Sequence, residues 1–473
     1  MKMFDRQVSL GLIIASREFF NGTLALDARR DVIAQLDKLG IGYHILPVDA
    51  TNNGTVETKE DVRKYVQLFD EHRHDIDGFV VLLPNFGDEI AVIETIQRSK
   101  LNVPVLVQAS NDELDKVDLR GRRDSFCGKL SVCNNLRQFG IRFSLTRQHT
   151  MDPQSPAFRE DLRWFDQVCR VVKGLRSARV GAIGSRPAAF NTVRYSEKIL
   201  EAHGISVEVV DLSEILGRIG RLYDTDGRVH DRIALIREYQ PMMNVPEASL
   251  LKMAKLAVVL DEWIEETGVV ATAMQCWTSI EEFYGVAPCT VMSMMSNRLL
   301  PSACEVDITG AIGMYALTLA TGVPAALLDW NNNYGEDPDK CVLFHCSNVP
   351  KACFSHMQMG CQDIVGSTVG FENAHGTCVG RIKPGPFTFA RVSTDDLSGR
   401  IRAYAGEGEF TEDPLETFGG AGVAHIPDLQ RLLHSLCANG FEHHVAIAHA
   451  RVARALGEAM GNYLGWDIQL HNA

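Results

Sequence analysis

The sequence lacks several patterns that would assign it to large classes of protein. None of its twelve cysteines forms a CxxC pair, so zinc ribbons and thioredoxin-like redox sites have no support. No run reaches the ~18 apolar residues of a membrane helix, and the first residues do not have the pattern of a secretory signal peptide. Acidic residues outnumber basic ones, 60 to 47, which argues against nucleic-acid or anionic-membrane binding. We expect a cytoplasmic protein with reduced, mostly buried thiols.

The first part of the chain alternates apolar strands with helices. At 473 residues the chain is too long for one ordinary domain. Continuous apolar strands separated by amphipathic helices indicate a parallel sheet that is covered on both faces. The strands are expected at 8–16, 42–48, 77–84 and 103–108. We therefore predict a doubly wound, flavodoxin-like α/β domain over residues 1–172.

A second α/β series begins near residue 175. Its expected elements are strand 178–185, helix 190–204, strand 205–212, helix 247–267 and strand 269–277. The segment VGAIGSRP in its first turn contains GxxG but not GxGxxG, so a dinucleotide site is disfavoured. We predict a second doubly wound parallel-sheet domain over residues 173–330.

The last part of the chain is rich in short strands. Expected strands lie at 341–347, 376–382, 387–394 and 400–410, separated by glycine and proline. This spacing is typical of an antiparallel sheet or a barrel. We predict a β-rich, barrel-like C-terminal domain over 331–473, which ends in a helix (445–463) and a strand (465–471). The fold class is therefore α/β, with two parallel-sheet domains followed by this β-rich domain.

Two carboxylates stand in an apolar setting in the segment SACEVDITGAIGMYAL. Acidic side chains are rarely buried unless they are paired, protonated or bound to metal. Glu305 and Asp307 are two residues apart, so on an extended segment they share a face while Val306 points away. Capping of the helix that begins near Gly310 is an alternative, although it requires only one acid. The acids of SIEEFYG (279–285) follow another apolar strand, so both pairs are expected at strand ends of one parallel sheet.

Histidines supply a third element. His443 and His444 open the segment FEHHVAIAHARVARAL near the end of the chain. Two adjacent histidines are also compatible with an exposed position at the start of a segment, without any role in a site. Combined with the separated carboxylates, however, it offers oxygen and nitrogen donors that suit Mn²⁺ or Mg²⁺ with open positions for substrate oxygens.

An ordered series of blocks resembles the L-fucose isomerase/L-arabinose isomerase superfamily, in particular its shorter fucose-isomerase-like members. The blocks span most of the chain and follow the family's order: RRDSFCGKLS, GSRPAAFNT, CWTSIEEFYGVAPC, ACEVDITGAIGMYAL, HCSN, KPGPFTFARVSTDD, GEGEF and EHHVAIAHA. The resemblance implies two α/β domains followed by a β-rich domain.

The resemblance also implies site residues. Glu281 matches the family's catalytic and metal-ligating glutamate, Asp307 its second catalytic carboxylate and ligand, and His444 its histidine ligand. Glu282 and His443 are alternates for the first and third positions, and Glu305 would contact substrate or support the ligands. Further substrate contacts are expected from the following residues, each of which also fits a surface, core or turn role: Arg17, Arg186, Asn191, Trp330, His345 and Asn348.

The implied activity is metal-dependent aldose–ketose isomerisation of a free monosaccharide through a cis-enediol, with hydride shift as the rival mechanism. The expected cofactor is Mn²⁺, with Mg²⁺ or Co²⁺ as alternatives, and the expected partner is a further copy of the chain whose N-terminal domain completes the site. Fucose, arabinose and sulfoquinovose types of substrate all fit. A non-catalytic sugar-binding protein and an NAD(P)-linked sugar oxidoreductase are the alternative functions.

Overall fold

A computed structural model describes residues 7–118, 121–242 and 244–472. The chain divides into two compact units. The N-terminal unit runs to Lys173 and includes Glu458–Gly465, and the C-terminal unit comprises Gly174–Gly457 and Trp466–Ala473. The predicted second and third domains therefore lie in one unit, and the predicted boundary at residue 330 falls inside a strand, β10 (Ala326–Asn333).

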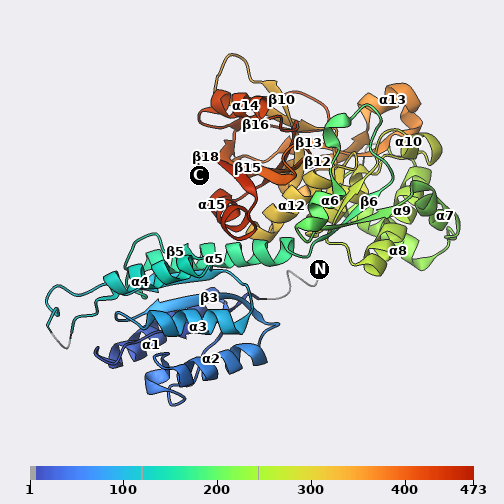
Figure 1. Ribbon diagram of the computed structural model, residues 1–473. Helices are drawn as coiled ribbons and strands as arrows, with labels where there is room; N and C mark the ends of the chain where they lie inside the picture. The colour runs from blue at the N-terminus through green and yellow to red at the C-terminus, as the bar shows by residue number, and fades with distance from the viewer. Residues whose placement is uncertain (1–6, 119–120, 243, 473) are drawn as a thin grey trace. The chain divides into compact units, whose positions relative to one another are not determined.

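The N-terminal unit is the predicted doubly wound α/β domain. Its five parallel strands have the order β2-β1-β3-β4-β5, and helices cover both faces of the sheet (Figure 1). The strands are β1 (Ser9–Ile14), β2 (Gly42–His44), β3 (Ile76–Leu83), β4 (Val105–Ala109) and β5 (Ser144–Leu145). The helices are α1 (Thr23–Leu39), α2 (Lys59–Glu71), α3 (Glu89–Ser99), α4 (Ser125–Gln138) and α5 (Pro156–Leu175). β3 is buried along its whole length, as its continuous apolar sequence predicts.

The C-terminal unit begins with a second parallel sheet in the order β7-β6-β8-β9. Its strands are β6 (Arg179–Ile183), β7 (Ser206–Val210), β8 (Ala271–Met274) and β9 (Ser302–Cys304). The helices of this part are α6 (Glu197–Ala202), α7 (Leu212–Gly220), α8 (Gly227–Tyr239), α9 (Glu247–Thr267), α10 (Ser279–Phe283), α11 (Cys289–Asn297) and α12 (Ile308–Thr321). The helix predicted over 190–204 is thus confined to α6, and the apolar segment 291–296 lies in helix α11.

A nine-stranded mixed sheet forms the rest of the C-terminal unit, in the order β12-β13-β16-β11-β10-β17-β14-β15-β18. Besides β10 its strands are β11 (Lys340–His345), β12 (Phe354–Cys361), β13 (His375–Ile382), β14 (Gly385–Asp395), β15 (Arg400–Phe410), β16 (Gly420–His425), β17 (His444–Ala448) and β18 (Asp467–His471). Its helices are α13 (Asp363–Val369), α14 (Leu429–Ala438) and α15 (Ala453–Gly457). β16 also pairs with β15; the barrel remains a prediction.

The helix predicted over 445–463 is wrong in its first part. Residues His444–Ala448 form β17, which pairs with β10 on one side and β14 on the other. Valine and isoleucine alternate with alanine there, and such a segment is stable between two strands although its composition also fits a helix. Helix begins only at α15, and a π-helical turn (Glu458–Tyr463) follows it.

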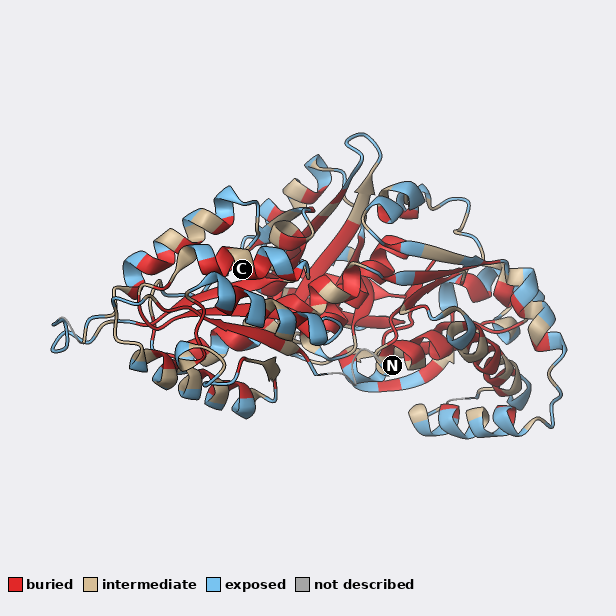
Figure 2. Cartoon of the chain, turned by 60° about the horizontal axis from the view of Figure 1, so that its bottom comes forward, coloured by how far each residue is buried: buried red, intermediate tan, exposed pale blue. Residues whose placement is uncertain are grey.

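Helix α12 joins the two sheets of the C-terminal unit. It contacts β6, β8 and β9 of the parallel sheet and β14 and β17 of the mixed sheet. It is buried from Ile308 to Ala320, and β17, which it contacts, is buried along its whole length. Figure 2 shows the buried residues of the chain in red. The apolar run GAIGMYAL therefore belongs to a helix surrounded by protein, whose N-terminus lies directly after the two predicted carboxylates.

Candidate active site

The candidate site lies where β9 ends and α12 begins. Glu305 and Val306 have positive φ angles, 61° and 55°, so the chain turns sharply between the strand and the helix. The expectation that Glu305 and Asp307 share one face of an extended segment is therefore wrong. Asp307 is the N-cap of α12, and its Oδ1 accepts a hydrogen bond of 2.8 Å from the backbone N–H of Gly310.

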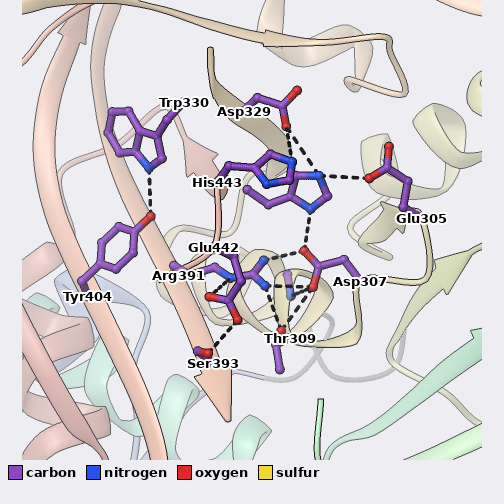
Figure 3. Close-up of polar contacts among 12 residues, drawn as sticks. Glu305, Asp307, Thr309, Asp329, Trp330, Arg391, Ser393, Tyr404, Glu442 and His443 are labelled. Atoms are coloured by element: carbon purple, nitrogen blue, oxygen red, sulfur yellow. Dashed lines mark hydrogen bonds and ion pairs between the residues drawn. The ribbon is translucent and has the colours of Figure 1, made fainter. Parts of the chain in front are cut away.

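His444 contacts the two carboxylates with its two ring nitrogens; Figure 3 labels these carboxylates, Glu305 and Asp307, and the residues around them. Its Nδ1 lies 2.7 Å from Oδ2 of Asp307, and its Nε2 lies 3.1 Å from Oε2 of Glu305. Burial lowers the pKa of this imidazole, but the hydrogen bond to Asp307 and the negative charges of Asp307 and Glu305 outweigh burial and raise it to about 10. The ring is thus held by one carboxylate while its other nitrogen faces the second.

A third carboxylate approaches the same ring from the mixed sheet. Asp329 on β10 is the cross-strand partner of His444 on β17, which places the two side chains next to each other. Its Oδ1 lies 3.5 Å from Nε2 of His444 and 3.7 Å from Nε2 of His443. His444 is 1% exposed, whereas the side chain of His443 is 45% exposed, so His444 is the histidine inside the site.

Asp307 has its acceptor positions occupied by neighbours. Besides Gly310 and His444, it accepts hydrogen bonds from both terminal nitrogens of Arg391 and from the hydroxyl of Thr309. Asp307 and Arg391 are completely buried. Burial raises the pKa of the Asp307 carboxyl, but the Arg391 charge and the His444 hydrogen bond lower it well below its usual range. Asp307 therefore remains ionised, and its carboxylate fixes the orientation of the His444 ring.

Arg391 and its second partner, Glu442, were missed by sequence reasoning. Arg391 on β14 donates from Nε to Glu442, 3.2 Å away, and Glu442 accepts a 2.6 Å hydrogen bond from Ser393. An arginine in the middle of the apolar strand FTFARVST is the signal that would have indicated this network, because a buried guanidinium requires a buried carboxylate.

The residues present fit a divalent metal ion. Oε2 of Glu305, Nε2 of His444 and Oδ1 of Asp329 are buried, and none has a hydrogen-bond partner; unpaired buried polar atoms are costly unless something binds them. Glu305, His345 and His444, all buried, place one donor atom each within 4.8 Å of one another, and so do Asp329, His443 and His444. Carboxylate and imidazole donors with unfilled positions suit Mn²⁺ and similar ions.

Glu281 lies on α10, directly after β8. It is 1% exposed, and its Oε2 is another buried atom without a partner. Burial is the main cause that raises the pKa of its carboxyl to about 8. The neighbouring Glu282 is exposed. None of the three groups of candidate metal donors found among the described residues includes Glu281.

The structure brings some of the remaining predicted residues to the site and places others elsewhere. His345 ends β11, and burial is outweighed by neighbouring Cys346 and acids, which raise its pKa to about 9. Trp330 donates from Nε1 to the Tyr404 hydroxyl, and Asn348 donates to the Ser302 carbonyl, so both have structural partners. Arg17 belongs to the N-terminal unit, where it pairs with Glu89. In the C-terminal unit, Asn191 is exposed and Arg186 lines a cavity beside Val306.

Gly310 leaves room for this arrangement. A Cβ atom there would lie 2.7 Å from Cγ of Asp307 and 3.0 Å from Nη1 of Arg391. We expect Gly310→Ala to destabilise the protein by about 1–3 kcal/mol, because neither buried group can move freely. We also expect metal affinity to fall by about 10- to 100-fold, because a displaced Asp307 carboxylate would no longer orient His444. Gly313→Ala is the matched control on the same helix, since its Cβ would have ordinary contacts from 3.5 Å. Urea unfolding and metal titration measure both effects; equal results for the two variants would contradict the proposed crowding.

No helix of the described residues is long and apolar enough to cross a membrane. Residues 11–176 match the family model of the fucose/sulfoquinovose isomerase N-terminal domain, and residues 343–471 match that of the L-fucose isomerase C-terminal domain. A sulfoquinovose isomerase from Alkalicoccus urumqiensis is 25% identical over 81% of this chain and 83% of its own length. A sulfoquinovose isomerase from Priestia megaterium is 25% identical over 84% of this chain and 86% of its own length. Another from Clostridium sp. is 25% identical over 70% of this chain and 73% of its own length.

Among solved structures, the chain is similar to a glucose-galactose binding protein from Geobacillus stearothermophilus, at 11% sequence identity and a TM-score of 0.17. The match covers 67% of this chain and 92% of the binding protein. That score is too low to support an argument. The two family models cover both ends of the chain, and the curated relatives extend across its middle, where the carboxylates lie. The chain belongs to the L-fucose isomerase/L-arabinose isomerase superfamily, as a fucose-isomerase-like aldose–ketose isomerase.

Proposed function

We propose that the protein is a divalent-metal-dependent isomerase of a free hexose that carries a sulfonate at C6, acting through a cis-enediol. The observation that carries the metal requirement is the pair of buried, unpartnered donors, Oε2 of Glu305 and Nε2 of His444, 3.1 Å apart. The names of the curated relatives, all sulfoquinovose isomerases, support the substrate class.

Glu305, His345 and His444 would hold the ion, with Mn²⁺ preferred over Mg²⁺ or Co²⁺. When bound, a divalent ion supplies electrophilic stabilisation of the negative charge that develops on O1 and O2 of the sugar. Asp307 keeps Nδ1 of His444 occupied, so that Nε2 is directed toward Glu305. Arg391 in turn holds the Asp307 carboxylate in place. Asp307, expected from the resemblance to be a ligand, is thus proposed to orient one.

Glu281 is proposed as the group that moves the carbon-bound proton. As a carboxylate it removes the proton from C2 of the aldose, and as a carboxylic acid it returns a proton to C1, which yields the ketose. With a pKa raised to about 8, the Glu281 side chain is present both as carboxylate and as carboxylic acid near neutral pH. The hydroxyl proton moves from O2 to O1 in the same conversion.

Proton transfer through Glu281 predicts exchange with solvent. In D₂O we expect deuterium at C1 of the ketose, and at C2 of aldose that is re-formed. NMR of the product measures the deuterium content at each carbon. A hydride shift would carry the C2 hydrogen to C1 without exchange, so complete absence of deuterium during prolonged turnover would contradict the role of Glu281.

Metal removal tests the proposed function directly. Dialysis against EDTA is expected to reduce conversion of sulfoquinovose to its ketose by at least about 10²-fold, and added Mn²⁺ is expected to restore it. Fucose and arabinose in the same NMR assay test the two rival substrate types. Full activity of protein shown by elemental analysis to be metal-free would contradict the proposal.

We further propose that the protein works in the cytoplasm as a homo-oligomer, with the N-terminal unit of a neighbouring copy completing each site. The family resemblance and the substrate-contact role proposed for Arg17, which belongs to the N-terminal unit, support this. Mixing two inactive variants tests it. Arg17→Ala and Glu305→Gln chains, unfolded and refolded together, are expected to regain part of the activity if one copy supplies Arg17 to the site of another. No regain would show that both residues act within one chain.

A further inference from the structure

A cavity lies at the carboxyl end of β6, and Val306, the residue that follows Glu305 in the chain, forms part of its wall. It has a volume of about 470 Å³ and reaches from β6 and β7 to Val306. In this sheet β7 lies on one side of β6 and β8 on the other. The chain thus reverses direction across the sheet between β6 and β8, and such a point is where open α/β sheets bind ligands. The backbone N–H of Val306 bonds to the carbonyl of Met274 at the end of β8, so the wall of the cavity reaches this point. The volume is within the range of small-molecule sites.

Two arginines give this cavity its charge. Arg186 follows β6, and Arg194 precedes α6; both line the cavity, and neither has an ion pair with a carboxylate among the residues that the structure describes. Arg186 donates from Nη1 to the carbonyls of Pro187 and Ala188, at 3.2 and 3.3 Å, which leaves its other nitrogens available. Among the described residues that line the cavity, Glu197 is the one carboxylate, so the described lining has an excess of positive charge.

The loop that presents Arg186 is fixed by the neighbouring strand end. Gly184 has a φ of 79°, and a Cβ atom there would lie 2.6 Å from Oε1 of Gln275. The same oxygen accepts a 2.9 Å hydrogen bond from the backbone N–H of Ser185, while Nε2 of Gln275 donates to Ser279. Arg186 therefore lies on a turn that is hydrogen-bonded to Gln275, and Gln275 begins the segment between β8 and Glu281.

We propose that Arg186 and Arg194 form the subsite for the anionic group at C6 of the sugar. This proposal rests on the proposed function, since it deepens the choice of substrate. Val306 lines the cavity, and its neighbour in the chain, Glu305, is a proposed metal ligand. In the proposed arrangement the hexose presents O1 and O2 to the metal donors and C6 to the cavity. Guanidinium groups bind oxyanions through charge-assisted hydrogen bonds that neutral sugars cannot form.

The test compares two sugars that differ only in the sulfonate: sulfoquinovose and quinovose (6-deoxyglucose). Arg186→Gln and Arg194→Gln are each expected to raise KM for sulfoquinovose about 10- to 100-fold, with kcat changed by less than about 3-fold because the reacting carbons lie elsewhere. KM for quinovose is expected to stay within about 2-fold. Arg221→Gln, an exposed arginine outside the cavity, is the matched control. Equal effects on both sugars, or no effect on either, would overturn the proposal.

Binding of a non-reacting ligand separates this proposal from the proposed function. Methyl sulfoquinovoside cannot open to an aldose, so its binding, measured by calorimetry, does not depend on turnover. Binding that is at least about 10-fold weaker in the double variant R186Q/R194Q, whose unfolding midpoint is unchanged, would support the subsite even if no sugar were isomerised. Wild-type affinity in that variant would overturn the subsite even if sulfoquinovose were isomerised.

Discussion

Replacing Glu305 by glutamine is expected to lower isomerase activity by about 10³-fold and to abolish tight metal binding. Glutamine keeps the shape of the side chain but removes the negative charge, which faces Nε2 of His444 at 3.1 Å. Loss of the charge stabilisation that a bound ion supplies corresponds to several kcal/mol, and 1.36 kcal/mol is a tenfold change in rate. Steady-state kinetics and the metal content of dialysed protein measure the two effects.

The control is Glu265→Gln, which makes the same change on an exposed residue of α9. It should leave activity and metal content within about twofold of wild type. If Glu305→Gln retained one ion per chain and activity within about threefold, Glu305 would not be a ligand. The second group, Asp329, His443 and His444, would then be the better candidate.

Breaking the buried ion pair beneath the site is expected to have the largest effect on stability. Arg391→Met leaves the completely buried Asp307 carboxylate without its charge partner. Removal of one member of such a pair destabilises a protein by about 3–5 kcal/mol. We expect this loss in the free energy of unfolding measured with urea, together with weaker metal binding because His444 loses its fixed neighbour.

Two further variants separate the ion pair from a general effect of losing an arginine. Arg400→Met, at an exposed position of β15, is expected to change the free energy of unfolding by less than about 0.5 kcal/mol. The double variant R391M/D307L is expected to recover part of the loss, because it removes both charges. A loss in Arg391→Met no larger than in Arg400→Met would show that the pair does not stabilise the fold.

Much of the fold could be predicted because local patterns determined it. Continuous apolar strands at 8–16 and 77–84 are β1 and β3, and the glycine-separated strands after residue 340 are β11, β13, β14 and β15. Segments whose composition fits two structures could not be assigned from the sequence. The segment HVAIA is a strand because β10 and β14 flank it, and that pairing is not local information.

The site was predicted in outline but not in its contacts. Acids at strand ends pointed to Glu305, Asp307 and the pair Glu281 and Glu282, from which the family resemblance selected Glu281. Glu281, Glu305 and Asp307 are all buried. The roles of Glu305 and Asp307 depend on a turn with two positive φ angles and on Arg391, neither of which periodicity reveals. Asp329 reaches His444 only through the register of β10 against β17. Spacing in the sequence gives candidates, whereas register and turns decide which atoms meet.

The most direct test of the central claim is an anomalous difference map from crystals of the protein grown with Mn²⁺. The account predicts one strong peak per chain, bonded to Oε2 of Glu305 and Nε2 of His444, with His345 adjacent and Asp307 still paired with Arg391. A peak bonded to Asp307, a peak between Asp329 and His443 without Glu305, or a fully active crystal with no peak would contradict it.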